Sequence, residues 1–83
     1  MNDTIIILQA IEKLGAKLRE EFEIDVRVRF VGDGQRFVFL SVFDNEEHKC
    51  LYIDNFGHKS ESALEFCDRL IAYCEDNDLF RKL

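Results

Sequence analysis

The sequence predicts an α+β fold in which a three-stranded antiparallel meander lies between two helices, with both helices packed on one face of the sheet. Three observations predict it. Residues 24–31 alternate apolar and charged side chains, which is the period of a strand with one buried face. Turn-forming stretches at residues 32–34 and 44–47 divide the middle of the chain. Apolar residues on either side of this region recur every three or four positions, as in a helix.

The first helix is expected over residues 4–22. Asp3 or Thr4 can cap its start, because their side chains accept hydrogen bonds from free backbone N–H groups. One apolar stripe follows, formed by Ile7, Ile11, Leu14, Leu18 and Phe22. Gly15 in mid-helix costs about 1 kcal/mol relative to alanine, so we expect it to permit close packing on the sheet.

Three strands are expected over residues 24–31, 36–43 and 48–54. The second strand is apolar on both faces, which suits a central position in the sheet. The Asp33-Gly34 dipeptide favours a two-residue type I′ turn between the first two strands.

This turn sets the strand register and therefore the two faces of the sheet. It places Phe30 opposite Phe37. The face expected to form the core holds Ile24, Val26, Val28, Phe30, Phe37, Phe39 and Phe43. The other face holds Arg27, Arg29, Arg36, Val38, Leu40, Val42, Lys49, Leu51 and Ile53. This second face is an apolar strip edged by cations, and we expect it to contact a partner or to form a homodimer.

The second turn leaves one alternative open. If Asn45-Glu46 forms it, Cys50 and Tyr52 join the core face. A slip of one residue would exchange them with Leu51 and Ile53.

The last helix is expected over residues 60–77, with Ser62 and Glu65 as a capping box. Its core stripe consists of Ala63, Phe66, Cys67, Leu70, Tyr73 and Cys74. The polar side of this helix is strongly acidic.

Length and composition predict one folded domain over residues 1–83, since 47% of the residues are hydrophobic and eight are Phe. The net charge of −6 disfavours binding to phosphate backbones. It is compatible with a protein partner that has a basic surface. We expect no membrane association, because the run of residues 5–8 is too short to span a bilayer.

The reactive side chains do not form a recognisable constellation. His48 and His58 lie beside turns, no Cys-x-x-Cys occurs, and the three cysteines fall in strand or helix rather than loops. We therefore expect no enzyme, no metal site and no cofactor. Unpaired thiols are typical of a cytoplasmic protein, and the location would be the host cytoplasm if a phage encodes the chain.

The order helix–strand–strand–strand–helix, from about Ile5 to Cys74, resembles the double-stranded-RNA-binding domain. That family grips phosphates with lysines at the start of its last helix, where residues 57–62 here hold Lys59 followed by Glu61. The resemblance implies two helices on one sheet face. An alternative function is an RNA-binding or homodimerising accessory domain that uses the face with Arg27, Arg29, Arg36 and Lys49.

The same order, the short length and the acidic balance are also similar to small phage-encoded anti-CRISPR proteins. The residues that carry this resemblance are Glu20, Glu21, Glu23, Asp25, Asp44, Glu46, Glu47, Glu61, Glu65, Asp68, Glu75, Asp76 and Asp78. All of these except Asp25, Glu61 and Asp78 are expected to bind the partner. The resemblance implies an inhibitor that presents carboxylates where its target would bind nucleic acid. The function expected first is thus a non-enzymatic protein-binding module that occupies a basic surface of its partner.

Overall fold

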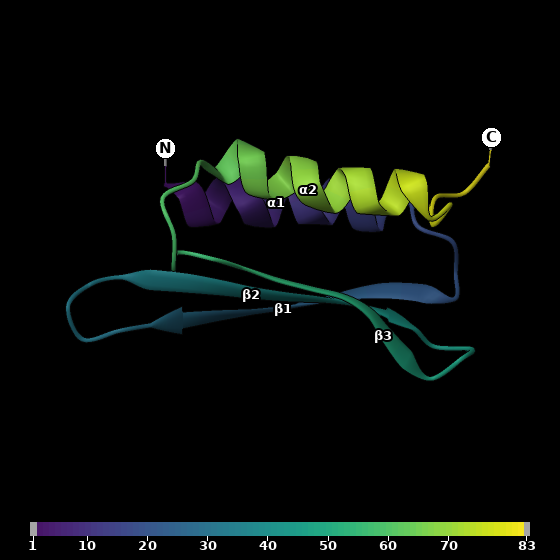
Figure 1. The fold of residues 1–83 in the computed structure, drawn as a ribbon, viewed down its shortest axis with the longest axis horizontal. Helices are drawn as coiled ribbons and strands as arrows, with labels where there is room; N and C mark the ends of the chain where they lie inside the picture. Colours follow the sequence, from purple (N-terminus) through teal and green to yellow (C-terminus); the bar gives the residue numbers. More distant parts are fainter. Residues whose placement is uncertain (1, 83) are drawn as a thin grey trace.

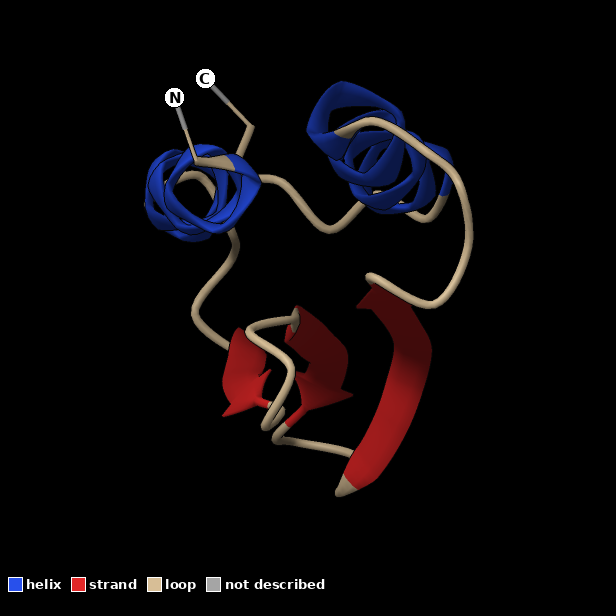
Figure 2. Cartoon of the chain, turned by 90° about the vertical axis from the view of Figure 1, so that its left-hand side faces the viewer, coloured by secondary structure: helices blue, strands red, loops and turns tan. Residues whose placement is uncertain are grey.

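A computed structural model describes residues 2–82 and has both helices on one face of a single antiparallel sheet (Figure 1). Its elements are α1 (Asp3–Gly15), β1 (Phe22–Phe30), β2 (Arg36–Asp44), β3 (Lys49–Phe56) and α2 (Ala63–Asp76). The strand order is β1-β2-β3, a simple meander. In the end view, α1 lies over the β1 side and α2 over the β3 side (Figure 2). The predicted fold class is confirmed.

Helix α1 is shorter than predicted because it ends at Gly15. The apolar stripe continues beyond the helix since the chain stays against the core. Leu18 forms an isolated bridge with Phe80, and Phe22 begins β1. A Cβ atom on Gly15 would meet nothing within 4 Å, so the predicted role of this glycine in close packing is wrong.

The loop between β1 and β2 spans residues 31–35 and is longer than the predicted two-residue turn. Val31 N–H donates to the carbonyl of Gln35 at 2.9 Å. A type I′ turn needs positive φ at both central residues. Gly34 has φ 90°, but Asp33 does not adopt positive φ, and its carboxylate instead accepts a hydrogen bond from Gln35 N–H at 3.0 Å.

The longer loop shifts the register by one residue, so Phe37 lies opposite Arg29 rather than Phe30. A one-residue shift exchanges every side chain of a strand between the faces. The predicted faces of β1 are right, but those of β2 are wrong. The core face of β2 holds Val38, Leu40 and Val42, all at most 1% exposed. The face away from the helices holds Phe37, Phe39 and Phe43.

A β-bulge changes the faces of β3. The register shifts between Val42 and Phe43, so that Tyr52 lies opposite Val42 while Cys50 lies opposite Phe43. Leu51 is the extra residue of the bulge. Tyr52 therefore faces the helices as predicted, but the placement of Cys50 in the core is wrong.

The core lies between the sheet and the helices, and a short segment after α2 closes one end of it. We refer to residues 79–82 as the C-terminal strap. Leu79 is 2% exposed. Arg81 N–H donates to the carbonyl of Lys17 at 2.8 Å, and Arg81 Nε donates to the carbonyl of Leu18 at 2.9 Å. The strap thus holds the connector between α1 and β1 against α2.

The reactivity of the three cysteine thiols tests the strand register that the bulge produces. Cys50 is exposed, whereas Cys67 is 5% and Cys74 0% exposed. Burial raises the pKa of Cys67 and raises the pKa of Cys74 to about 11. Because the thiolate is the reactive form, we expect Ellman's reagent to modify only Cys50 in the native protein. The other two should react after addition of denaturant. Rapid reaction of a second thiol, or protection of Cys50 at concentrations at which the protein is monomeric, would contradict this register.

Candidate protein-binding surfaces

The sheet face away from the helices is a candidate binding surface, which we call the open face. Among the described residues, no element covers it. It consists of Glu23, Asp25, Arg27, Arg29, Phe37, Phe39, Ser41, Phe43, Cys50, Ile53 and Asn55. Aromatic side chains thus run along the central strand, with charged side chains on β1 and the 74% exposed Ile53 on β3.

Neighbouring side chains partly cover the aromatic row. The ring of His58 stacks on Phe37 with centroids 4.2 Å apart and an interplanar angle of 21°. The guanidinium of Arg29 lies 5.6 Å from the ring centroid of Phe39. Beside these rings is a shallow hollow of about 410 Å³, lined by Asp25, Arg27, Arg29, Phe39, Ser41, Phe43 and Ile53. Aromatic and Arg side chains around a hollow are typical of protein interfaces.

Both signs of charge occur on the open face. Arg27 Nε lies 3.9 Å from the carboxylate of Asp25, and both side chains are well exposed. Along β1 the acidic residues come first and the basic residues follow. This face therefore lacks the uniformly positive charge that a phosphate backbone favours.

A second candidate surface is the end of the molecule where α1 and α2 finish and the β2–β3 turn lies (Figure 1, right). Asn45 N–H donates to the carbonyl of Glu21 at 2.8 Å, which joins this turn to the start of β1. Arg19 lies 3.9 Å from the carboxylate of Asp78, which joins the same region to the end of α2. We call this surface the acidic end. Its carboxylates are Glu20, Glu21, Glu23, Asp44, Glu46, Glu47, Glu75, Asp76 and Asp78. The cations Arg19, Arg81 and Lys82 lie among them.

The structure thus gathers most of the predicted acidic contact residues. Glu65 and Asp68 are separate from them, because both lie on the first half of α2. Of the predicted sheet-face residues, Arg27, Arg29 and Ile53 lie on the open face. The others do not: Val38, Leu40 and Val42 are core, Leu51 packs against the core, Arg36 lies opposite Phe30 on the helix side, and Lys49 lies opposite Asp44.

Sequence reasoning missed an ion cluster on the helix side of β3. Arg69 donates from Nε to Asp54 Oδ2 at 2.9 Å, and its other nitrogens bind both carboxylate oxygens of Glu61. Tyr52 OH donates to Asp54 at 2.9 Å. No local spacing signals this cluster, since Arg69 is 8 and 15 residues away from its two acidic partners.

The cluster shifts the pKa values of its members. Burial tends to raise the pKa of Asp54, but hydrogen bonds from Arg69 and Tyr52 outweigh it and the pKa lies below its ordinary value. The hydrogen bonds from Arg69 also lower the pKa of Glu61. Burial, together with Asp54, raises the pKa of Tyr52 to about 12. Each carboxylate has its cation, so the arrangement joins β3 to α2 and offers no free acid or base.

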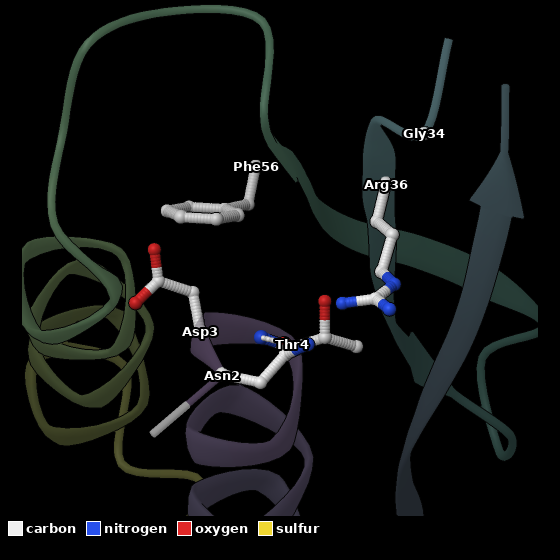
Figure 3. A pocket seen from close by; sticks show the side chains of 6 residues that line it. All are labelled: Asn2, Asp3, Thr4, Gly34, Arg36 and Phe56. Atoms are coloured by element: carbon white, nitrogen blue, oxygen red, sulfur yellow. Dashed lines mark hydrogen bonds between the residues drawn. The ribbon is translucent and has the colours of Figure 1, made fainter.

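A hollow of about 360 Å³ lies where α1 starts above the sheet, lined by Asn2, Asp3, Thr4, Gly34, Arg36 and Phe56. Figure 3 shows the guanidinium of Arg36 directed from β2 toward Thr4. Asn2 caps α1, because its side chain accepts a hydrogen bond from Thr4 N–H at 2.7 Å. The hollow holds no histidine or cysteine that could act as a nucleophile or base.

Two further properties of residues 2–82 bear on function. No three side chains of the metal-binding types come together in them. Neither helix has the length and apolar character needed to cross a bilayer.

Comparisons of the chain with protein-family models, with curated proteins and with solved structures found no match. The fold and its surfaces define the class as a small α-β-β-β-α protein with an open sheet face.

Proposed function

We propose that this protein is a non-enzymatic protein-binding module that occupies a basic, nucleic-acid-binding surface of its partner, in the manner of a small phage-type inhibitor of the anti-CRISPR kind. The observation that carries the proposal is the acidic end. Carboxylates from three separate segments of the chain lie at this end of the molecule, where they outnumber the cations Arg19, Arg81 and Lys82. Such a surface resembles a phosphate backbone in charge and attracts basic proteins over a long range.

The open face supplies a second contact in this proposal. Its hollow is bordered by the rings of Phe39 and Phe43 and by Ile53, which provide apolar area for affinity. Glu23 belongs to both surfaces and links them. A partner that contacts the acidic end can therefore extend onto the aromatic row.

A capture experiment with a matched control tests the proposal. The immobilised full chain is incubated with a bacterial lysate, and captured species are eluted with salt or with heparin, a polyanion. We expect a basic protein that both eluents release. A variant with Glu20→Lys, Glu46→Lys and Glu47→Lys should lose this capture by at least about tenfold.

The control variant carries Asp3→Lys, Glu65→Lys and Asp68→Lys. It has the same net charge as the test variant, but its changes lie on the helices away from the acidic end. We expect it to retain the partner. Equal loss of capture in both variants would show that only total charge matters, and the proposal would then be wrong.

The alternative function is nucleic-acid binding, and the aromatic row on the open face favours it. Single-stranded nucleic acids bind by stacking bases on such rings beside basic side chains. Here Arg27 and Arg29 border the rings, while Asp25 and Glu23 oppose phosphate on the same strand. Nuclease-sensitive capture that is lost on Arg27→Glu would support this alternative over the protein partner.

A further inference from the structure

Strand β1 is a long and regular sheet edge. It spans nine residues, and β2 is the only strand it pairs with among residues 2–82. Its pairing with β2 runs in one continuous register without a bulge. Natural edge strands are normally short, bulged, interrupted by proline, covered by a helix or loop, or guarded by charged side chains, because free backbone groups recruit other strands. Of these devices β1 has charged side chains, and all four of them lie on the open face. All helix-facing residues of β1 are apolar.

The backbone groups that point away from β2 can be assigned from the ladder. Residues opposite each other in an antiparallel pair alternate between bonded and non-bonded pairs. Val31 bonds to Gln35, and Glu21 bonds to Asn45, in the same register. The odd-numbered residues of β1 therefore bond to β2, and the even-numbered residues direct N–H and C=O to the free edge. The free ladder begins after Phe22, whose N–H already donates to the carbonyl of Arg19.

The side chains of β1 are self-complementary about Val26. In an antiparallel pair of two β1 strands centred there, Asp25 lies opposite Arg27 and Glu23 lies opposite Arg29. The apolar residues match in the same way, since Ile24 meets Val28 and Phe22 meets Phe30. This register pairs the even-numbered residues of one copy with those of the other. Because their N–H and C=O groups point to the free edge, the two strands can form backbone hydrogen bonds. The charged residues then form non-bonded pairs, where cross-strand side chains approach most closely.

The apolar side of this edge is incompletely covered within one copy. Val26 and Val28 are only partly buried, and Phe30 is 71% exposed. Helix α1, which lies over this side of the sheet (Figure 2), also exposes Ile5 and Leu8. Pairing of two β1 strands would bring the α1 helices of both copies onto the same face, next to each other. A second copy would thus cover apolar surface as well as backbone groups.

We propose that the protein forms a two-fold symmetric homodimer through antiparallel pairing of its β1 edges, centred on Val26. The two sheets join into one continuous sheet with all helices on one face. The open faces remain uncovered and lie side by side. This inference does not depend on the proposed function, since the free backbone edge and the side-chain register of β1 carry it, and of the residues at the acidic end it uses only Glu23.

Charge exchange tests the dimer in sedimentation equilibrium of the full chain at high micromolar concentration. Asp25→Arg places like charges opposite Arg27 at two symmetric positions, and Arg27→Asp places like charges opposite Asp25. We expect each single variant to weaken dimerisation at least about tenfold, because like charges directly opposite destabilise strand pairing. The double variant with both changes restores opposite charges and should restore the dimer. A monomeric wild-type protein, or a double variant weaker than both single variants, would overturn the proposal.

Three further measurements distinguish this dimer from one formed through the open face. Cys50 lies on the open face, so it stays reactive in an edge-paired dimer and becomes protected in a face-to-face dimer. Val26→Pro removes an edge N–H that β2 does not use and should abolish dimerisation. Ile53→Ser on the open face should leave dimerisation unchanged.

Circular dichroism shows whether each variant is folded. If Val26→Pro unfolds, the charge-exchange series decides. Protection of Cys50 together with a monomeric Ile53→Ser variant would assign the dimer to the open face instead.

Discussion

Substitution of Gly57 by alanine is expected to lower the free energy of unfolding by about 3 kcal/mol. Gly57 follows β3 and has φ 112°, a conformation that side chains rarely adopt. An added Cβ would lie 2.8 Å from the carbonyl oxygen of Arg36 and 2.8 Å from Cδ1 of Phe37. The first of these contacts is with backbone, so relief requires movement of β2 itself. Urea denaturation monitored by circular dichroism measures the change.

Gly15→Ala is the matched control for this prediction. Gly15 is exposed, its φ is not positive, and no atom would contact the new methyl group within 4 Å. Alanine at this helical position should be neutral or raise the free energy of unfolding by about 0.5 kcal/mol. Similar losses at both glycines would show that the strain assigned to Gly57 is absent.

Arg69→Met is expected to lower the free energy of unfolding by about 2 kcal/mol at neutral pH. Methionine keeps the aliphatic packing but leaves the carboxylates of Asp54 and Glu61 without their cation, and the Glu61 side chain is only 4% exposed. Loss of one partner from a buried ion pair costs about 3–5 kcal/mol. The smaller value applies here because 37% of the Arg69 side chain is exposed and solvent screens part of the interaction.

The effect of Arg69→Met should depend on pH. Arg69 lowers the pKa values of Asp54 and Glu61 below the ordinary 3.8 and 4.5, so it stabilises the fold where both groups are ionised. This contribution is complete above the unfolded-state pKa values and is lost as the pH falls through the lowered values. The difference between wild type and variant should therefore be constant from about pH 6 to 8 and shrink below about pH 4. A difference that stays constant down to acid pH would contradict the role of the ion cluster.

Arg27→Met provides the control for the loss of an arginine. Its guanidinium lies 3.9 Å from Asp25, but the side chain is 83% exposed. Exposed ion pairs contribute little, so at protein concentrations at which the chain is monomeric the free energy of unfolding should change by less than about 0.5 kcal/mol. A larger change at higher concentrations would indicate that β1 carries an interaction in solution beyond the single chain, such as pairing with a second copy.

The order and type of the elements could be predicted because the periods of strand and helix differ. The end of α1 could not, since Leu18 and Phe22 remain on the core side after the helix has ended. Their spacing continues the apolar stripe of α1 although the backbone is no longer helical at these two residues. Apolar periodicity reports which residues face the core, and it does not report which backbone conformation brings them there.

The faces of β2 could not be predicted because this strand is apolar on both sides. Only the turn before it fixes which side is buried, and the hydrogen bond from Gln35 N–H to Asp33 selects a longer turn than the dipeptide suggests. The bulge in β3 could not be predicted either, because nothing in the neighbouring sequence marks Leu51 as an extra residue. The acidic residues were recognisable in the sequence, whereas their convergence depends on the meander that brings distant segments to one end.

The C-terminal strap has a consequence for the order of folding. Its bond from Arg81 Nε to the carbonyl of Leu18 joins positions 63 residues apart, whereas the two hairpins close over short loops. Closure of so long a segment has a large entropic cost, so the hairpins form early and the strap docks late. Arg19 N–H also donates to the carbonyl of Leu79 in the strap, at 3.0 Å. We expect these strap bonds to open first in the native state, so the amides of Arg19 and Arg81 should exchange with solvent faster than those of the central strand. We therefore expect the acidic end to be the last part of the molecule to acquire its shape and the first to lose it.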